Sequence, residues 1–183
     1  MKSILVKEMM VPIADYATVD EDATLYEVVL ALEGAQQKKE NNNKYIDVLV
    51  LDKAENVVGK VSPLDLIKGL EEGYNKIGEL KYVSHSGYTI EFIRSMMEKY
   101  KLWEKPLDQI CMKAAQRKVK NIMSTPSEDE YIEANLSLDA AIHQILMGRY
   151  QSLIVIEAGK IQGLLRACDV HRHICSIIKA CRL

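Results

Sequence analysis

The stretch VVGKVSPLDL, residues 57 to 66, decides how the rest of the chain is interpreted. Val57 and Val58 precede Gly59, Lys60 and Val61 follow it, and after Ser62 a proline opens a run whose apolar residues recur at helical spacing. A serine followed by proline is typical of a helix start, because serine is a good N-cap and a helix tolerates proline only in its first turn. The stretch therefore predicts a strand that leads directly into a helix, with Ser62 and Asp65 in the first turn of that helix.

The same arrangement occurs a second time along the chain. Val57-Val58-Gly59 aligns with Ile161-Gln162-Gly163, and Asp65 aligns with Asp169 at the same offset. Two further pairs of segments match in the same order: Val6-Lys7-Glu8-Met9-Met10 with Val119-Lys120-Asn121-Ile122-Met123, and Tyr45 to Leu51 with Tyr150 to Ile156. Ordered self-similarity of this kind indicates an internal repeat. The chain therefore contains two copies of one unit, and QQKKENNN, residues 36 to 43, is an insertion in the first copy.

Each copy predicts the order strand, helix, strand, strand, helix. The predicted strands that open the copies are 17–19 and 131–133, the first helices follow Thr24 and Ser137, the hairpins turn at 53–56 and 157–160, and the last helices start at Ser62 and Arg166. This order predicts an α/β (α+β) fold of two β-α-β-β-α units. Because a unit of about 60 residues is marginally stable alone, we expect the two units to pack as a pseudo-symmetric pair.

The predicted domains are a first copy at 1–70, a helical connector at 71–118 and a second copy at 119–183. Within the connector, FIRSMMEKY (92–100) and PLDQICMKAA (106–115) show helical spacing of apolar residues. We expect these helices to cover a face of the module. The connector's large apolar side chains are interpreted as packing residues rather than as a ligand box; they are Phe92, Met96, Leu102 and Trp103.

Composition excludes several classes of function. The 183 residues are 48% hydrophobic, and the net charge is -2, with 24 Lys and Arg against 26 Asp and Glu. Without a basic field, a nucleic-acid partner is not expected. No apolar run approaches the roughly 20 residues that a membrane span needs, and Lys7 and Glu8 interrupt the apolar start before a secretory core can form. We therefore expect a cytoplasmic protein without a membrane partner.

Taken together, the two copies of the pattern apolar-x-Gly-apolar-apolar-Ser-x-x-Asp-apolar, each preceded by Val-Lys-x-x-Met, resemble a tandem pair of CBS domains, the Bateman module. The resemblance covers 6–70 and 119–179. It implies a regulatory module and not an enzyme, and it implies no cofactor other than a regulatory ligand. In this family that ligand is an adenosine compound (AMP, ADP, ATP or S-adenosylmethionine), bound in the cleft between paired domains. The resemblance further implies a homodimer that signals to a protein partner.

The resemblance also assigns site residues. Asp65 and Asp169 take the position of the ribose ligand, and Ser62 takes the position of the phosphate ligand. Adenine contacts are implied for the segment that leads into the first strand of each copy, and these residues are Tyr16, Ala17 and Thr18 in the first copy and Glu130, Tyr131 and Ile132 in the second. The second copy departs from the pattern, because Arg166 stands where Ser or Thr is usual. Asp47 departs as well, since a proline often opens that strand in the family.

Elementary chemistry leaves two interpretations of these residues open. A helix start attracts anions, and a carboxylate beside it can accept hydrogen bonds from a cis-diol, so ribose phosphate fits the pattern. Alternatively, Ser62 and Asp65 form a capping box worth about 1 kcal/mol without any ligand. Arg166 either clamps a phosphate or pairs with Asp169 and shuts the cleft.

Two other functions are carried as alternatives. One is a structural dimerisation or interaction module whose ligand sites have degenerated. The other is a metal or redox sensor, because Cys168, His171 and Cys175 share one helical face, although a metal would need a further ligand from elsewhere. Nucleophilic catalysis has no support, since the chain lacks a G-x-S-x-G elbow, a P-loop and a G-x-G-x-x-G motif.

Overall fold

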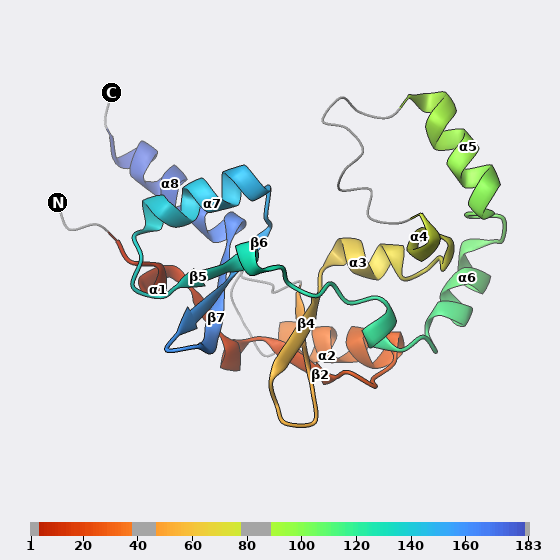
Figure 1. Ribbon diagram of the computed structural model, residues 1–183, viewed down its shortest axis with the longest axis horizontal. Helices are drawn as coiled ribbons and strands as arrows, with labels where there is room; N and C mark the ends of the chain where they lie inside the picture. Colours follow the sequence, from red (N-terminus) through yellow and green to blue (C-terminus); the bar gives the residue numbers. More distant parts are fainter. Residues whose placement is uncertain (1–3, 38–46, 78–88, 182–183) are drawn as a thin grey trace. The chain divides into compact units, whose positions relative to one another are not determined.

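The chain forms two compact units, each with one small sheet (Figure 1). The computed structural model describes residues 4–37, 47–77 and 89–181. The first-repeat unit is Ala17–Ser124, and the second-repeat unit combines Met1–Tyr16 with Thr125–Leu183. Most of the predicted insertion at 36–43 lies outside the described residues. The two compact units are defined by packing. The predicted limits 1–70, 71–118 and 119–183 divide the sequence by its repeats instead, and they stay a prediction.

The first-repeat unit has a three-stranded sheet in the order β2-β3-β4. Its elements are β2 (Ala17–Asp20), α2 (Leu25–Gln37), β3 (Val48–Leu51), β4 (Val57–Val61), α3 (Pro63–Lys68), α4 (Gly73–Lys76), α5 (Ile90–Tyr100), α6 (Leu107–Ala114) and the 3-10 turn η3 (Val119–Asn121). β2 runs parallel to β3, and β3 and β4 form the expected antiparallel hairpin. Apolar residues from β2, β3 and β4 share one core with Leu25 and Val28 of α2.

The second-repeat unit has a four-stranded sheet in the order β1-β7-β6-β5. Its elements are α1 (Val6–Met9), β1 (Val11–Pro12), η1 (Ile13–Asp15), η4 (Glu128–Glu130), β5 (Tyr131–Glu133), α7 (Leu138–Gly148), β6 (Ser152–Glu157), β7 (Lys160–Arg166) and α8 (Ala167–Ala180). β5 and β6 are parallel, and β6 and β7 form a hairpin. The mixed α/β class with two β-α-β-β-α units is thus confirmed.

The segment that precedes each repeat in sequence completes the core of the other repeat. Val6 and Val119 align with each other in the two copies, and both are fully buried. The amide of Val6 donates to Leu136 O at 2.9 Å, and the amide of Val119 donates to Ala23 O at 2.8 Å. Val6 therefore belongs to the core beside β6 and β7, whereas Val119 belongs to the core beside β3 and β4.

Gly59 and its equivalent Gly163 leave space for these segments, each of which precedes one repeat in sequence and packs on the other. In the second-repeat unit, β1 pairs with β7 and places Pro12 opposite Gly163. A Cβ atom on Gly163 would lie 2.1 Å from the Val11 carbonyl oxygen. In the first-repeat unit, Ser124 crosses β4 in the equivalent way, and a Cβ atom on Gly59 would lie 2.5 Å from Met123 Sδ. Both repeats therefore need a residue without a side chain where the incoming segment crosses the hairpin.

The connector contains the two expected helices, α5 and α6. Thr89 caps α5 by accepting a hydrogen bond from the Phe92 amide at 3.1 Å, and Pro106 is the N-cap of α6 rather than its first helical residue. In the described part of the chain, α5 packs against α4 and leaves apolar side chains of its own exposed. Leu102 is 5% exposed, as expected for a packing residue, whereas Phe92 is 38% exposed. Met96 and Trp103 are half-buried, so Leu102 is the buried packing residue of this set and Phe92 is its exposed member.

Replacing the crossing glycines tests the exchange. Gly163→Ala should destabilise the protein by about 1–3 kcal/mol, because the added methyl group meets backbone that cannot yield. Gly59→Ala should cost less, since the nearest atom belongs to the flexible Met123 side chain. Gly34→Ala in α2 is the matched control, because nothing lies within 4 Å of its Cβ position, and it should stabilise by about 0.5–1 kcal/mol. Urea unfolding measures all three, and equal effects at Gly163 and Gly34 would contradict the crossing.

Candidate functional site

The residues assigned to the first copy gather at one end of the β2-β3-β4 sheet. Ala17 lies opposite Val48, and Val48 lies opposite Val61 on its other side. Ser62 directly follows Val61, and Asp47 directly precedes Val48. The start of β2, the start of β3 and the end of β4 therefore meet at this edge. Asp47 is buried there, so a carboxylate lies close to the start of α3.

Ser62 and Asp65 are joined to each other at the start of α3. Asp65 Oδ2 accepts hydrogen bonds from the Ser62 amide at 3.0 Å and from Ser62 Oγ at 2.6 Å. Ser62 Oγ in turn accepts from the Asp65 amide at 3.3 Å, which completes the capping box. Among the residues that the structure describes, none donates a hydrogen bond to Asp65 Oδ1. The cap therefore uses one oxygen of the carboxylate and leaves the other available.

In the second copy, the equivalent carboxylate is bound on both oxygens. Arg166 Nε donates to Asp169 Oδ2 at 2.5 Å, and Arg166 Nη2 donates to Oδ1 at 2.8 Å. Arg172 Nη1 lies 3.3 Å from the same Oδ1. The Arg166 and Asp169 side chains are 5% and 12% exposed. A two-pronged pair of this kind, shielded from water, is stronger than a surface ion pair, and it occupies the position that the resemblance gives to a ribose.

Burial and the pairing with Asp169 have opposite effects on the pKa of Arg166. Removal from water disfavours its charged form, but the hydrogen bond to Asp169, with electrostatic contributions from Tyr16, Asp169 and Cys168, more than compensates. The pKa of Arg166 is therefore raised. Arg166 also lies opposite Ser152 in the β6-β7 hairpin, and Ser152 is buried. The guanidinium is thus a charged part of the interior of the second-repeat unit.

The structure divides the expected adenine-contact residues between the two units. Tyr16 is buried in the second-repeat unit, whereas Ala17 and Thr18 open β2 in the first-repeat unit. Thr18 is exposed, and Tyr131 is half-buried on β5, where it pairs with Ile154.

The cysteine and histidine face of α8 forms one close contact. Cys175 Sγ lies 3.4 Å from His171 Nε2, and Cys168 is exposed. Within residues 4–37, 47–77 and 89–181, no group of three or more His, Cys, Asp or Glu side chains is placed to hold a metal ion. Across the same residues, no helix combines the length and apolar character needed to cross a membrane.

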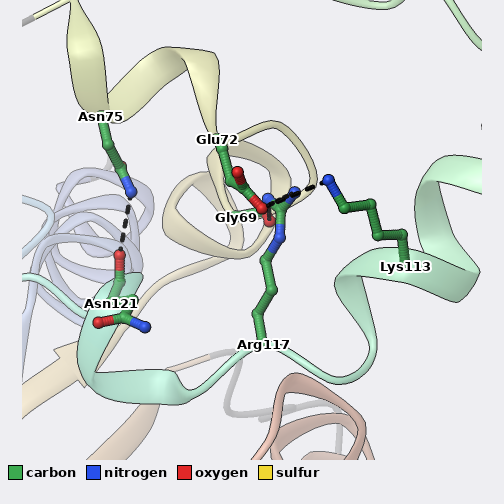
Figure 2. A network of polar contacts seen from close by, with 6 residues as sticks. All are labelled: Gly69, Glu72, Asn75, Lys113, Arg117 and Asn121. Carbon is green, nitrogen blue, oxygen red and sulfur yellow. Dashed lines mark hydrogen bonds and ion pairs between the residues drawn. The ribbon is translucent and has the colours of Figure 1, made fainter.

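A polar network that the sequence did not predict anchors the far end of α3. Figure 2 shows its members, which are Gly69, Glu72, Asn75, Lys113, Arg117 and Asn121. Arg117 Nη1 donates to Gly69 O at 2.6 Å, and Arg117 Nη2 lies 3.1 Å from Glu72 Oε1. The network ties the helix that begins with Ser62 to the segment that precedes η3. Nothing in the sequence around Arg117 signals this, because its partners lie far away along the chain.

Comparison with known proteins supports the fold. The family model for the CBS domain matches residues 6–72, and no curated protein matches the chain. The CBS-pair protein CBSX2 from Arabidopsis thaliana is 18% identical, with a TM-score of 0.54 over 97% of this chain and 99% of that one. CBSX2 solved in complex with AMP is 18% identical, with a TM-score of 0.56 over 94% and 97%. The cytosolic domain of the Mg²⁺ channel MgtE in complex with ATP is 17% identical, with a TM-score of 0.52 over 90% and 46%.

The two carboxylates should differ sharply in their effect on stability. Asp169→Ala leaves the buried Arg166 guanidinium without its partner and should cost about 3–5 kcal/mol. Asp65→Ala removes only one half of a cap and should cost about 1 kcal/mol. Urea unfolding of both variants measures the difference. Adding Arg166→Met to Asp169→Ala should restore most of the loss, and a double variant no better than the single one would contradict the account.

Proposed function

We propose that the chain, whose residues 6–72 match the CBS-domain model and whose fold is that of a tandem CBS pair, is a non-catalytic regulatory module that binds an adenosine-containing ligand. The ligand classes are AMP, ADP, ATP and S-adenosylmethionine. The site is the end of the β2-β3-β4 sheet, with Asp65 as the ribose ligand and Ser62 beside the phosphate. The ligand state of this site is passed to a protein partner through the relative populations of two conformations.

The observation that carries the proposal is the open oxygen of Asp65. Its Oδ2 is used by Ser62, while Oδ1 accepts no hydrogen bond from the described residues. A half-buried carboxylate oxygen is a strong acceptor for a ribose hydroxyl. The capping box therefore does not compete with ribose binding; it holds the carboxylate in position for it.

The start of α3 also offers a donor for a phosphate. The Ser62 amide is used by Asp65 and Pro63 has no amide hydrogen, so the next donor along the chain is the Leu64 amide. It has no acceptor among the described residues. An oxyanion at this position would meet the Leu64 amide, whereas the Ser62 hydroxyl could donate to it only by giving up its hydrogen bond to Asp65 Oδ2.

Buried Asp47 limits which adenosine ligand fits best. Its carboxylate lies at the same end of the sheet as Ser62 and is 6% exposed. A second negative charge near the phosphate position disfavours polyphosphates more than a monophosphate or a sulfonium compound. AMP and S-adenosylmethionine are therefore placed ahead of ATP. Proteins of this fold have been solved with AMP, in CBSX2, and with ATP, in MgtE, so this order rests on Asp47 alone.

The second copy is proposed to be closed to ligand. Both oxygens of Asp169 are engaged by arginines, and the phosphate-side residue is Arg166, which is itself committed to the pair. Opening this site would require a ligand to replace a buried two-pronged ion pair. One ligand per chain follows from this difference.

The same ion pair favours a second candidate function, a structural module whose clefts hold no ligand. If Asp65 and Asp169 serve stability alone, the protein would dimerise and dock a partner without sensing an adenosine compound. Both candidates include a homodimer. Support for it comes from large apolar side chains that α7 and α8 leave exposed, namely Leu146, Met147, Ile174, Ile177 and Ile178.

Ligand titration separates the two candidates. AMP at about a hundred times its dissociation constant should raise the melting temperature by roughly 5 °C, and Asp65→Ala should abolish the shift. The Asp65→Ala variant should also lose its affinity for adenosine, because AMP and adenosine contain the same ribose. Ser62→Ala is the matched variant: it keeps the carboxylate but loses the hydroxyl on the phosphate side and the bond that orients Asp65, so it should weaken AMP more than adenosine. Calorimetric titration measures each affinity.

Arg166→Ser provides the opposite test, since it frees Asp169 Oδ2 and leaves only the exposed Arg172 beside Oδ1, and it should raise the stoichiometry of AMP from one to two per chain. No binding of AMP, adenosine or S-adenosylmethionine by the wild type would leave the structural candidate in place. Binding that is unchanged in Asp65→Ala would also remove the proposed site.

The dimer has its own test. Ile177→Glu and Ile178→Glu in α8 should convert the dimer to a monomer, because a buried charge at an apolar interface is costly. Ile90→Glu in α5 is a control of similar exposure and should leave the dimer intact. Sedimentation velocity over a range of concentrations measures the state, and a dimer that survives the α8 changes would place the interface elsewhere.

A further inference from the structure

A cavity of about 510 Å³ lies in the connector part of the first-repeat unit and shares no residue with the Ser62 and Asp65 site. Its lining comes from the end of α3, the turn between α5 and α6, α6 itself and the segment after α6. The lining residues that matter to its chemistry are the cations Lys101, Lys105, Lys113 and Arg117, the acids Glu71 and Glu104, and the amide of Gln109. The cavity is therefore cationic in a chain whose net charge is -2.

Two of these cations form no ion pair within the described part of the chain. Lys113 and Arg117 both lie against Glu72, at 3.5 Å and 3.1 Å. By contrast, Lys101 and Lys105 make no ion pair or side-chain hydrogen bond with any residue in 4–37, 47–77 or 89–181. Counting Glu72, the cavity keeps an excess of positive charge, and the excess is located at Lys101 and Lys105.

The turn that carries Lys101 is held in an unfavourable backbone conformation. Lys101 has φ 52° and Trp103 has φ 59°, so two of three consecutive residues are left-handed without being glycine. This conformation costs about 1–2 kcal/mol per residue. The turn is fixed from one side, because the Trp103 amide donates to Glu71 Oε1 at 2.8 Å and Trp103 Nε1 donates to Tyr74 Oη at 3.0 Å. Strain of this kind, maintained by specific contacts, is typical of functional turns.

Arg117 supplies a second unsatisfied group at the same cavity. Its two terminal nitrogens are engaged by Gly69 O and Glu72, while its Nε is buried and has no acceptor among the described residues. A buried N–H of a guanidinium without an acceptor is costly, and its usual explanation is a bound ion or water that completes it.

We propose that this cavity binds a small oxyanion-bearing molecule, with Lys101, Lys105 and Gln109 as direct ligands. Its volume falls in the range of small-molecule sites. The chemistry that it recognises is a cluster of phosphate or carboxylate groups on a compact body, since Leu70, Ile110 and Met112 also line the cavity. The site is separate from the proposed adenosine site and does not depend on it.

The test uses the full chain with inorganic pyrophosphate and with citrate as probes, at constant ionic strength. At about a hundred times its dissociation constant, the bound probe should raise the melting temperature by roughly 5 °C. Lys105→Ala and Lys101→Gly should each weaken the probe by about fivefold, as expected for loss of one neighbouring charge. Calorimetric titration measures the affinities.

Arg149→Gly is the matched control for Lys101→Gly. Arg149 is also an exposed cation in the left-handed position after a helix, with φ 53° at the end of α7 in the other unit. Glycine should therefore raise the melting temperature by about 2 °C in both variants. Only Lys101→Gly should also lose affinity for the probe, so that its stability and its binding change in opposite directions.

Each outcome bears on the proposal. Binding of only one probe supports the site and identifies phosphate or carboxylate as its ligand. No binding of either probe by the wild type, or equal affinities in Lys101→Gly and Arg149→Gly, overturns it. Loss of probe binding in Asp65→Ala would also overturn it, because the anion would then lie at the adenosine site. Failure of AMP to bind leaves this result unaffected.

Discussion

The burial of two equivalent valines, Val6 and Val119, is the interaction on which the rest of the fold depends. Each repeat supplies a small sheet and two helices, which bury too little apolar surface to be stable alone. The missing part of each core comes from the segment that precedes the other repeat. Gly59 and Gly163 lie where these segments cross the hairpins, and their missing side chains allow backbone to approach backbone. Gly59 in the stretch VVGKVSPLDL is thus explained by the segment of Met123 and Ser124 that crosses β4, a contact that is visible only in the folded structure.

The two repeats use the same carboxylate in different ways because one residue differs beside it. Ser62 donates to a single oxygen of Asp65 and leaves the other open, whereas Arg166 binds both oxygens of Asp169. A hydroxyl is a short, neutral donor, while a guanidinium is a fork that matches both carboxylate oxygens. The two copies of the unit therefore contain one carboxylate with a single bonded oxygen and one carboxylate with both oxygens bonded.

Arg117 of the connector contacts both α3 and the cationic cavity of the first-repeat unit. Arg117 binds the carbonyl oxygen of Gly69 at the end of α3, the helix whose first turn contains Asp65. The cavity lined by Lys101 and Lys105 has Arg117 in its wall. An anion in that cavity would lie beside a residue that holds the far end of α3, the helix at whose start the adenosine site is proposed. A coupling of this kind would be reciprocal, because linkage requires each ligand to affect the affinity of the other equally.

Sequence by itself determined the element order, the two hairpins, the helix starts and the repeat, because each depends on residues that are near one another along the chain. The periodicity of apolar residues around Val48 or Val155 and the turn residues after each strand are local signals. Only the tertiary structure decided which segment completes which core and that Tyr16 and Ala17 belong to different compact units. It also decided that the Arg166 guanidinium is bonded to Asp169. The Arg117 network belongs with these, since its partners are brought together from distant parts of the chain. Such contacts arise from packing between segments, and residue patterns within one segment carry no record of the partner that it will meet.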